Sequence, residues 1–223
     1  MPTEAAVKPC VPDRRYIAIE GVIGVGKTSL ARLLALEMGA RLNLEVVEEN
    51  PFLARFYADP KRYAFPTQIF FLLSRYRQQQ DFFQQDLFQQ QVVSDYLFAK
   101  DRIFANLNLS DAELHLYERL VTELEGRVPV PDLVVYLQAS VEVLMARIAR
   151  RGREYERHMP RSYIESLAEA YNHFFFHYEE SPLLVVNTND IDFVRNRDHF
   201  QDLRRHIETP FEGVQYYTPA YER

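Results

Sequence analysis

The sequence contains a single cysteine and no tryptophan among its 223 residues. Because Cys10 has no second thiol to pair with, an internal disulfide is excluded, which is typical of a reducing compartment. The chain also has no apolar run close to the roughly 18 residues that a transmembrane helix needs. Lysine, proline and aspartate interrupt the first residues, where a signal peptide would carry its apolar core. We therefore expect a cytoplasmic protein with no membrane partner.

Positive charge is also in short supply. Lysine and arginine number 26 against 32 acidic residues, and the net charge of -6 argues against a nucleic-acid polymer as partner. The apolar fraction of 47% and the length are ordinary for one well-buried domain. Both ends of the chain hold prolines and no periodicity, so we divide it into an N-terminal tail (1–14), a domain (15–208) and a C-terminal tail (209–223).

Glycine is scarce as well, with seven in the chain, and three of them fall within one short stretch. The stretch fits the pattern G-x-x-x-x-G-K-[ST] and reads Gly21, Val22, Ile23, Gly24, Val25, Gly26, Lys27 and Thr28, followed by Ser29. A β-branched run precedes it and a helical run follows, which is the context of a phosphate-binding loop. We expect this loop to bind ATP, with the Thr28 hydroxyl on a Mg²⁺ ion. An ordinary glycine-rich turn would not explain the Lys-Thr pair.

Strand-like and helical patterns alternate along the rest of the chain. This alternation predicts an α/β fold, an open parallel sheet with helices on both faces. The five expected strands are 16–19, 42–47, 92–95, 132–137 and 183–187, and a long helix is expected from about 66 to 91. Ligands of such sheets bind beyond the carboxyl ends of the strands, which selects the residues to inspect.

Two acids stand at such strand ends. Glu45 is at the end of the second expected strand, and Asp95 at the end of the third. If the phosphoryl acceptor is a neutral hydroxyl, Glu45 could take its proton, and Asp95 could hold Mg²⁺ directly or through water. Either acid could instead cap a following helix, and the neighbouring Glu48 is an alternative base.

An arginine-rich stretch follows the fourth expected strand. Its members are Arg147, Arg150, Arg151, Arg153, Arg157 and Arg161, with Gly152 among them as an expected hinge or helix terminator. A segment of this kind could close over phosphates as a lid and stabilise their charge. The alternative is a solvated charged face, with Glu154 and Glu156 as partners.

An ordered series of motifs narrows the choice of family. It comprises the phosphate loop, residues 45–51, residues 57–63, Gln68, Ser94-Asp95 and Arg151-Gly152-Arg153. With these motifs the chain resembles the deoxynucleoside kinases, most closely the bacterial branch that phosphorylates purine deoxynucleosides, from about residue 16 to 207. The resemblance implies a P-loop kinase fold, ATP and Mg²⁺, an arginine-rich lid and a homodimer.

The resemblance also implies roles for single residues. Glu45 falls on the general base, although Val46 replaces the usual proline after it. Tyr57, helped by Glu156, matches the tyrosine that binds the sugar 3′-hydroxyl, and Gln68 matches the glutamine at the base edge. Lys27, Arg151 and Arg153 would stabilise the transferring phosphoryl group.

A second set of expectations concerns the nucleobase of the substrate. Arg75 and Asp101 match a pair that meets the polar edge of a purine or cytosine, although alone they would suggest a surface ion pair. Phe56, Phe71 and Phe104 could stack on the base or fill the core.

One departure from the family pattern follows Asp95. The family usually has an arginine there, whereas this chain has Tyr96 and Leu97, so a lid arginine or Lys100 would have to compensate. Our first hypothesis is ATP-dependent phosphorylation of the 5′-hydroxyl of a 2′-deoxynucleoside, and we expect a purine. One alternative is a nucleoside monophosphate kinase of the thymidylate kinase type, which would need arginines rather than a base at its acceptor site. Another is a nucleotide-binding module without catalysis.

Overall fold

The computed structural model describes residues 15–47, 49–84, 91–157 and 159–217. Its strands are β1 (Tyr16–Gly21), β2 (Arg41–Asn43), β3 (Val92–Ser94), β4 (Leu133–Gln138), β5 (Leu183–Asn187) and β6 (Val214–Tyr217). Its α-helices are α1 (Lys27–Met38), α2 (Leu53–Ala58), α3 (Pro60–Gln84), α4 (Asp101–Asn108), α5 (Asp111–Glu125), α6 (Val141–Arg151), α7 (Arg161–Phe176) and α8 (Arg197–Glu208). Two 3₁₀ turns, η1 (Phe98–Lys100) and η2 (Glu154–Glu156), complete the elements.

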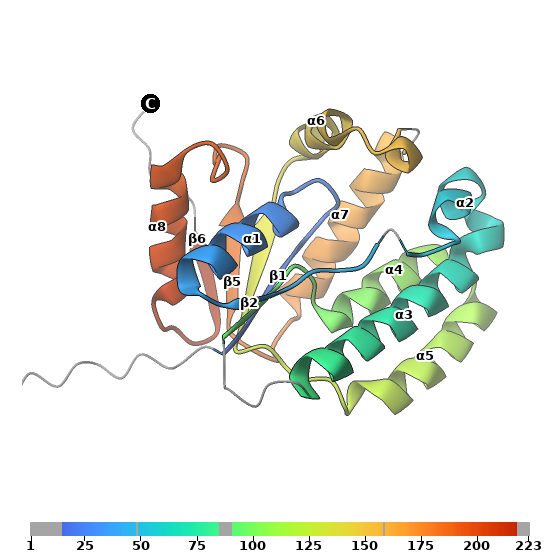
Figure 1. The fold of residues 1–223 in the computed structure, drawn as a ribbon. Coiled ribbons are helices and arrows are strands. Elements are labelled where there is room, and N and C mark those ends of the chain that lie inside the picture. Colours follow the sequence, from blue (N-terminus) through green and yellow to red (C-terminus); the bar gives the residue numbers. More distant parts are fainter. Residues whose placement is uncertain (1–14, 48, 85–90, 158, 218–223) are drawn as a thin grey trace, which may run out of the picture.

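The six strands form one parallel sheet in the order β2-β3-β1-β4-β5-β6. Figure 1 shows α1 and α8 on one side of this sheet and α4 and α7 on the other, with α3 and α5 further out. The central strands β1 and β4 are buried on both faces, as their continuous apolar sequences require. The predicted open parallel sheet with helices on both faces is therefore confirmed.

Residues outside the sheet fix where the elements begin and end. The Asp132 carboxylate accepts hydrogen bonds of 2.8 Å from the backbone N–H groups of Arg15 and Tyr16, which joins the starts of β1 and β4. Helix α5 begins with a capping box of Ser110 and Glu113. Gly152 ends α6 in the left-handed conformation (φ 69°), as its expected role as helix terminator requires.

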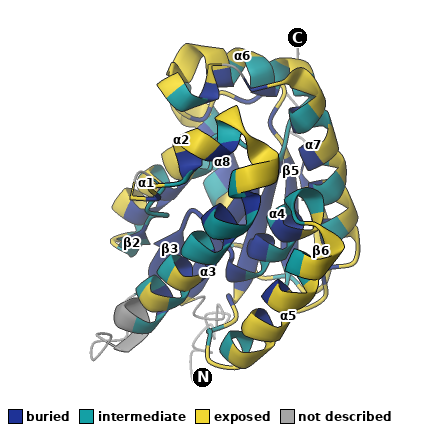
Figure 2. Ribbon diagram, turned by 90° about the vertical axis from the view of Figure 1, so that its right-hand side faces the viewer, coloured by how far each residue is buried: buried dark blue, intermediate teal, exposed yellow. Residues whose placement is uncertain are grey.

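The outer helices α3, α4 and α5 enclose a second, smaller core. Its buried members are Leu72, Phe98, Ala105, Tyr117 and Val121. Figure 2 shows the strands β3 and β5 in dark blue, whereas the outer surface of α5 is largely yellow. This second core holds α3 and α4 side by side, and both helices carry residues predicted for the site.

The prediction of five strands is wrong by one, since β6 comes from residues expected to form a C-terminal tail. β6 has four residues, Val214–Tyr217, of which only Tyr217 is buried, so the segment is too short to show a sustained alternation that would predict a strand. The second strand is shorter than expected, and Glu45 lies two residues beyond its end. Helix α3 begins at Pro60, six residues early, and includes Pro66 in its interior.

Parts of some predictions fall outside the described residues. These are the N-terminal tail 1–14 with Cys10, the alternative base Glu48, residues 85–90 of the long expected helix, and residues 218–223. Across the described segments, no helix combines the length and apolar character that a membrane crossing demands.

Candidate active site

The loop between β1 and α1 is shaped by its glycines. Gly21, Gly24 and Gly26 have φ values of 146°, 87° and 112°, a region that other residues rarely adopt. A Cβ atom on Gly24 would lie 2.7 Å from Ile148 Cγ1, and one on Gly26 would lie 3.1 Å from Phe193. Both conformation and space therefore require glycine, and the backbone runs directly into the N-terminus of α1, where N–H groups favour anions.

The side chains at the end of this loop provide a cation and oxygen ligands. Lys27 Nζ donates to the carbonyl oxygens of Gly21 at 2.6 Å and Val22 at 3.3 Å, and burial lowers the pKa of this lysine. Thr28 Oγ1 donates to Asp95 Oδ2 at 2.5 Å. Burial raises the pKa of Asp95, although the bond from Thr28 partly opposes the shift. A hydroxyl and a carboxylate that meet in this way fit the oxygen ligands that Mg²⁺ requires.

Glu45 lies opposite the loop, between two cations. Its Oε1 accepts from Arg75 Nε at 2.8 Å and Nη2 at 2.5 Å, and its Oε2 accepts from Lys100 Nζ at 2.8 Å. The Glu45 backbone N–H donates to Asp95 Oδ1 at 2.7 Å, so the two predicted acids are adjacent. Burial alone would raise the pKa of Glu45, but Lys100 and Arg75 outweigh it and hold this pKa below its ordinary value. The carboxylate is therefore ionised.

The residues expected at the base edge form a buried network on α3 and α4. Arg75, 5% exposed, also forms an ion pair with Asp101, and its guanidinium lies 4.8 Å from the centroid of the Phe71 ring. Asp101 accepts a 2.8 Å hydrogen bond from the Tyr117 hydroxyl, and Gln68 Nε2 donates to the Asp101 carbonyl oxygen at 2.8 Å. The sequence alone allowed a surface ion pair here, but the pair is buried.

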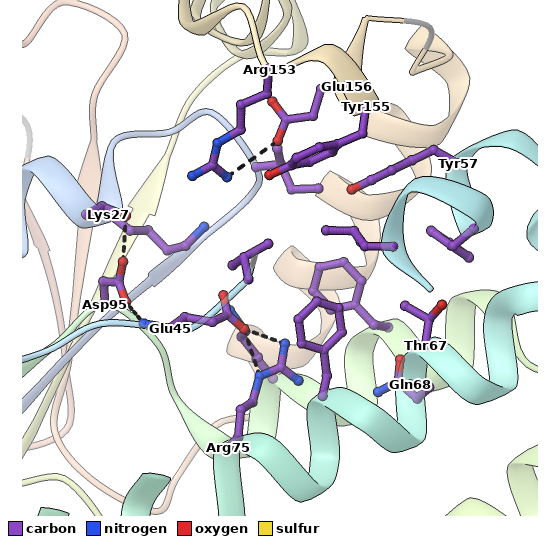
Figure 3. Close-up of a pocket in the computed structure, with 18 of the residues that line it drawn as sticks. Lys27, Glu45, Tyr57, Thr67, Gln68, Arg75, Asp95, Arg153, Tyr155 and Glu156 are labelled. Carbon is purple, nitrogen blue, oxygen red and sulfur yellow. Dashed lines mark hydrogen bonds and ion pairs between the residues drawn. The ribbon is translucent and has the colours of Figure 1, made fainter. Parts of the chain in front are cut away.

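These residues surround a cavity of about 260 Å³. Figure 3 shows Lys27, Asp95 and Glu45 along one side of it, Gln68 and Arg75 on α3, and Tyr57 with Tyr155 and Glu156 on another side. The lining combines these polar groups with the rings of Phe56, Phe71 and Phe104. Asp101 does not line the cavity but lies behind Arg75.

The arginine-rich stretch contacts this cavity through its middle part. Glu156 accepts from Arg151 Nη2 at 2.5 Å and Nε at 3.2 Å, and Arg153 Nη1 lies 3.8 Å from the same carboxylate. The Tyr57 and Tyr155 rings stack with centroids 5.9 Å apart, and burial raises the pKa of Tyr57 well above its ordinary value. Arg161 instead pairs with Glu142 and Glu165 at an exposed position, so part of the stretch is a solvated face.

A second cavity, of about 840 Å³, lies on the other side of the phosphate loop. Its lining includes residues 24–29 and the segment 189–194 after β5. Lys27, Thr28, Arg151 and Arg153 line both cavities. The two spaces therefore meet where a phosphate would rest on the loop.

The sequence reasoning named Arg147 as part of the arginine-rich stretch but missed the wall of the second cavity that it helps to form. Arg147 donates to the carbonyl oxygens of Val25 at 3.0 Å and Thr188 at 2.7 Å, and so joins the loop to the end of β5. Phe193 covers Gly26. The signal was available, because the rule that selected the ends of the second and third strands applies equally to the end of β5.

Comparisons with known proteins agree with this geometry. The sequence model of one family, described as deoxynucleoside kinase, matches residues 17–211. The chain is 36% identical over 198 residues to a deoxyguanosine kinase of Bacillus subtilis (strain 168). This alignment covers 86% of this chain and 96% of that protein. It is 30% identical over 201 residues to a deoxyadenosine/deoxycytidine kinase of the same organism, covering 86% and 91%.

The fold is likewise similar to that of a solved deoxyadenosine kinase from M. mycoides with bound dATP. That likeness has a TM-score of 0.75 at 25% identity and covers 86% of this chain and 98% of that one. The chain therefore belongs to the deoxynucleoside kinase family, as the sequence motifs predicted. Its reaction is the phosphorylation of a deoxynucleoside, with ATP as the phosphate donor that the kinase family implies.

Proposed function

We propose that the protein transfers the γ-phosphoryl group of ATP to the 5′-hydroxyl of a purine 2′-deoxynucleoside, with Glu45 as the general base. The observation that carries this proposal is the meeting of the two cavities at Lys27, Thr28, Arg151 and Arg153. A donor in the larger cavity and an acceptor in the smaller one would share that junction.

The donor side depends on the backbone and on cations. N–H groups of the loop and of α1 would bind the phosphates, and Lys27, Arg151 and Arg153 would stabilise charge as it spreads over the transferring group. The Thr28 hydroxyl and the Asp95 carboxylate would hold Mg²⁺, which neutralises charge on the triphosphate when it is bound. Residues 189–194 would face the base of the donor.

On the acceptor side, Glu45 accepts the proton of the 5′-hydroxyl as that oxygen attacks phosphorus. The new O5′–P bond forms while the bond from phosphorus to the leaving oxygen of ADP breaks, and the proton ends on the carboxylate. General-base assistance of this kind is typically worth about 10²–10⁴-fold in rate. Tyr57 and Glu156 would bind the 3′-hydroxyl of the sugar.

The charge of the acceptor site favours a neutral substrate over a monophosphate. Two buried cations, Arg75 and Lys100, face the buried carboxylates of Glu20 and Asp101 and the half-buried carboxylate of Glu45. Within this cluster, no positive charge is left over for an acceptor phosphate. Arg32, Arg151 and Arg153 also line the cavity, so the argument against a nucleoside monophosphate kinase rests on the carboxylate of Glu45 and not on a lack of arginines.

The preference for a purine draws on the base-edge network and on the relatives. Arg75, backed by Asp101, and Gln68 line the far end of the cavity and could donate to the acceptor atoms of a purine edge. The 36% identical Bacillus protein is named a deoxyguanosine kinase.

The test supplies the protein with labelled ATP and, separately, each of four deoxynucleosides and their monophosphates. We expect labelled monophosphate from deoxyguanosine or deoxyadenosine and little from thymidine. Transfer only to the monophosphates would overturn the proposal, and transfer chiefly to thymidine would overturn the purine preference. Omission of Mg²⁺ and addition of EDTA should abolish transfer, and excess Mg²⁺ should restore it.

We also expect a homodimer located in the cytoplasm. The homodimer is an expectation from the family resemblance, whereas the cytoplasmic location is an expectation from the single cysteine and the lack of long apolar runs in the sequence. Light scattering on the purified protein would test the first, and fractionation of the source cells would test the second.

A further inference from the structure

Lys100 is a buried lysine for which the reaction outlined above assigns no part. It is the last residue of η1, next to the first residue of α4, and it is only 3% exposed. Its Nζ lies 6.0 Å from the centroid of the Tyr96 ring. A buried ammonium group is costly unless carboxylates or other acceptors surround it, so its partners explain why it is here.

Those partners are two carboxylates from different parts of the chain. Lys100 Nζ lies 2.8 Å from Glu45 Oε2 and 3.3 Å from Glu20 Oε1. Glu20 is fully buried near the end of β1, the central strand that leads into the phosphate loop. Lys100 therefore lies between the core of the sheet and the carboxylate beside the cavity.

Glu20 is itself held rigidly. Its carboxylate accepts hydrogen bonds from the backbone N–H groups of Gly21 at 2.8 Å and Leu97 at 3.3 Å, and from the Tyr171 hydroxyl at 3.0 Å. These donors come from the phosphate loop, the segment after β3 and α7. Because Glu20 is fixed on three sides, it can serve as an anchor for Lys100.

Glu45, in contrast, lies outside the regular secondary structure, although its backbone N–H donates to Asp95 Oδ1 at 2.7 Å. It lies in the segment 44–47, which has no regular secondary structure, two residues past the end of β2. Its two carboxylate oxygens are held differently. Oε1 is bound by Arg75, which also pairs with Asp101 on the substrate-facing helices, whereas Oε2 is bound by Lys100.

We propose that Lys100, anchored by Glu20, is a positioning residue that holds Oε2 of Glu45 so that Oε1 can face the 5′-hydroxyl. This inference rests on the proposed role of Glu45 as the base. When the nucleobase of the substrate binds Arg75, Oε1 of Glu45 becomes available to the 5′-hydroxyl. Lys100 meanwhile keeps the Glu45 carboxylate in place. Tyr96, which follows Asp95, is fully buried and neutral, so Lys100 is the cation that this part of the chain supplies.

The test compares Lys100→Met with Lys100→Arg, each in the wild-type and in the Glu45→Gln background. Lys61→Met is the matched control, because it makes the same chemical change at an exposed position on α3. Thermal unfolding and ATP binding are measured for every variant, and kcat and KM are measured for ATP and the preferred deoxynucleoside.

We expect Lys100→Met to lower kcat about 100-fold, within the range of general-base assistance, while both KM values stay within about threefold. Lys100→Arg should restore at least about tenfold of the loss, and Lys61→Met should behave as wild type. In the Glu45→Gln background, Lys100→Met should lower the residual kcat less than about threefold, because residues that act as a unit are not additive.

Additive losses of kcat in the double variant would overturn the proposal, as would a raised KM with an unchanged kcat. If Lys100→Met does not fold, Glu20→Gln gives the same test, with an expected loss of about tenfold in kcat that also vanishes in the Glu45→Gln background. An unchanged kcat in Glu45→Gln alone would show that Glu45 is not the general base. A loss in Glu45→Gln without a loss in Lys100→Met or Lys100→Arg would remove only the role of Lys100.

Discussion

The phosphate loop, which would bind the donor, and the cavity beside Glu45, which would bind the acceptor, are built on opposite principles. They are called the donor loop and the acceptor cavity below. The loop is eight consecutive residues, 21–28, whose shape comes from glycine conformations and whose binding groups are largely backbone N–H groups. The cavity joins side chains from separate segments of the chain, and ion pairs link Glu45, Arg75, Lys100 and Asp101 at one side of it. A loop of this kind binds any triphosphate, whereas a network of buried charges can select one acceptor. It is also the more fragile of the two, because each removed charge leaves a partner unpaired.

The largest effect on this comparison should come from Glu45→Gln, which keeps the size of the side chain and removes its basicity. We expect kcat to fall about 10²–10⁴-fold while the deoxynucleoside still binds. Steady-state kinetics and calorimetric titration of the deoxynucleoside would measure both quantities. An unchanged kcat would transfer the base role to another acid.

Removal of Arg75, which pairs with both Glu45 and Asp101, should show how sensitive the acceptor network is to the loss of one charge. Arg75→Met leaves Asp101, which is 1% exposed, with a hydrogen bond from Tyr117 but without an ion pair to any other residue that the structure describes. We expect a loss of about 3–5 kcal/mol in the free energy of unfolding, measured with denaturant. Glu125→Gln breaks the more exposed pair of Arg102 and Glu125 and should cost about 0–1 kcal/mol. Equal costs for the two variants would contradict the contrast.

A methyl group added to the donor loop should sharpen the comparison from the other side. Gly24→Ala meets both a positive φ of 87° and Ile148 Cγ1 at 2.7 Å. Gly39→Ala, with φ 62° and nothing within 4 Å of the new Cβ, meets only the first. We expect Gly24→Ala to cost about 1–3 kcal/mol more in unfolding free energy and to raise KM for ATP. If the two variants have equal free energies of unfolding, the close packing of the loop on α6 does not contribute to stability.

The smallest effect should come from the expected sugar contact. Tyr57→Phe removes a single hydroxyl from the cavity wall and should raise KM for the 2′-deoxynucleoside about tenfold, the scale of one hydrogen bond. The KM for the matching 2′,3′-dideoxynucleoside, which lacks the 3′-hydroxyl, should stay the same. A parallel rise for both substrates would assign Tyr57 to general packing.

The same contrast explains how much could be predicted from the sequence. The phosphate loop, the parallel sheet and the family depend on local patterns, so they could be predicted from neighbouring residues. The alignment of Arg75 with Asp101 came from the family resemblance, and the structure adds that this pair is buried and reaches Glu45, 30 positions away from Arg75. No local pattern indicates that Lys100 reaches back to Glu20.

Other features were missed for different physical reasons. Strand β6 is a four-residue edge strand in which only Tyr217 is buried, so its pairing with β5 comes from tertiary context and not from a sequence pattern. The wall formed by residues 189–194 carries no recognisable motif, and only its place after β5 marks it.

A crystal structure with the preferred deoxynucleoside bound would test the central claim most directly. The account predicts that the 5′-oxygen lies within hydrogen-bond distance of Glu45 Oε1, and that Arg75 turns from Glu45 toward the base edge while Lys100 stays on Oε2. A complex in which Arg75 keeps both bonds to Glu45, with the 5′-oxygen out of reach of that carboxylate, would contradict it.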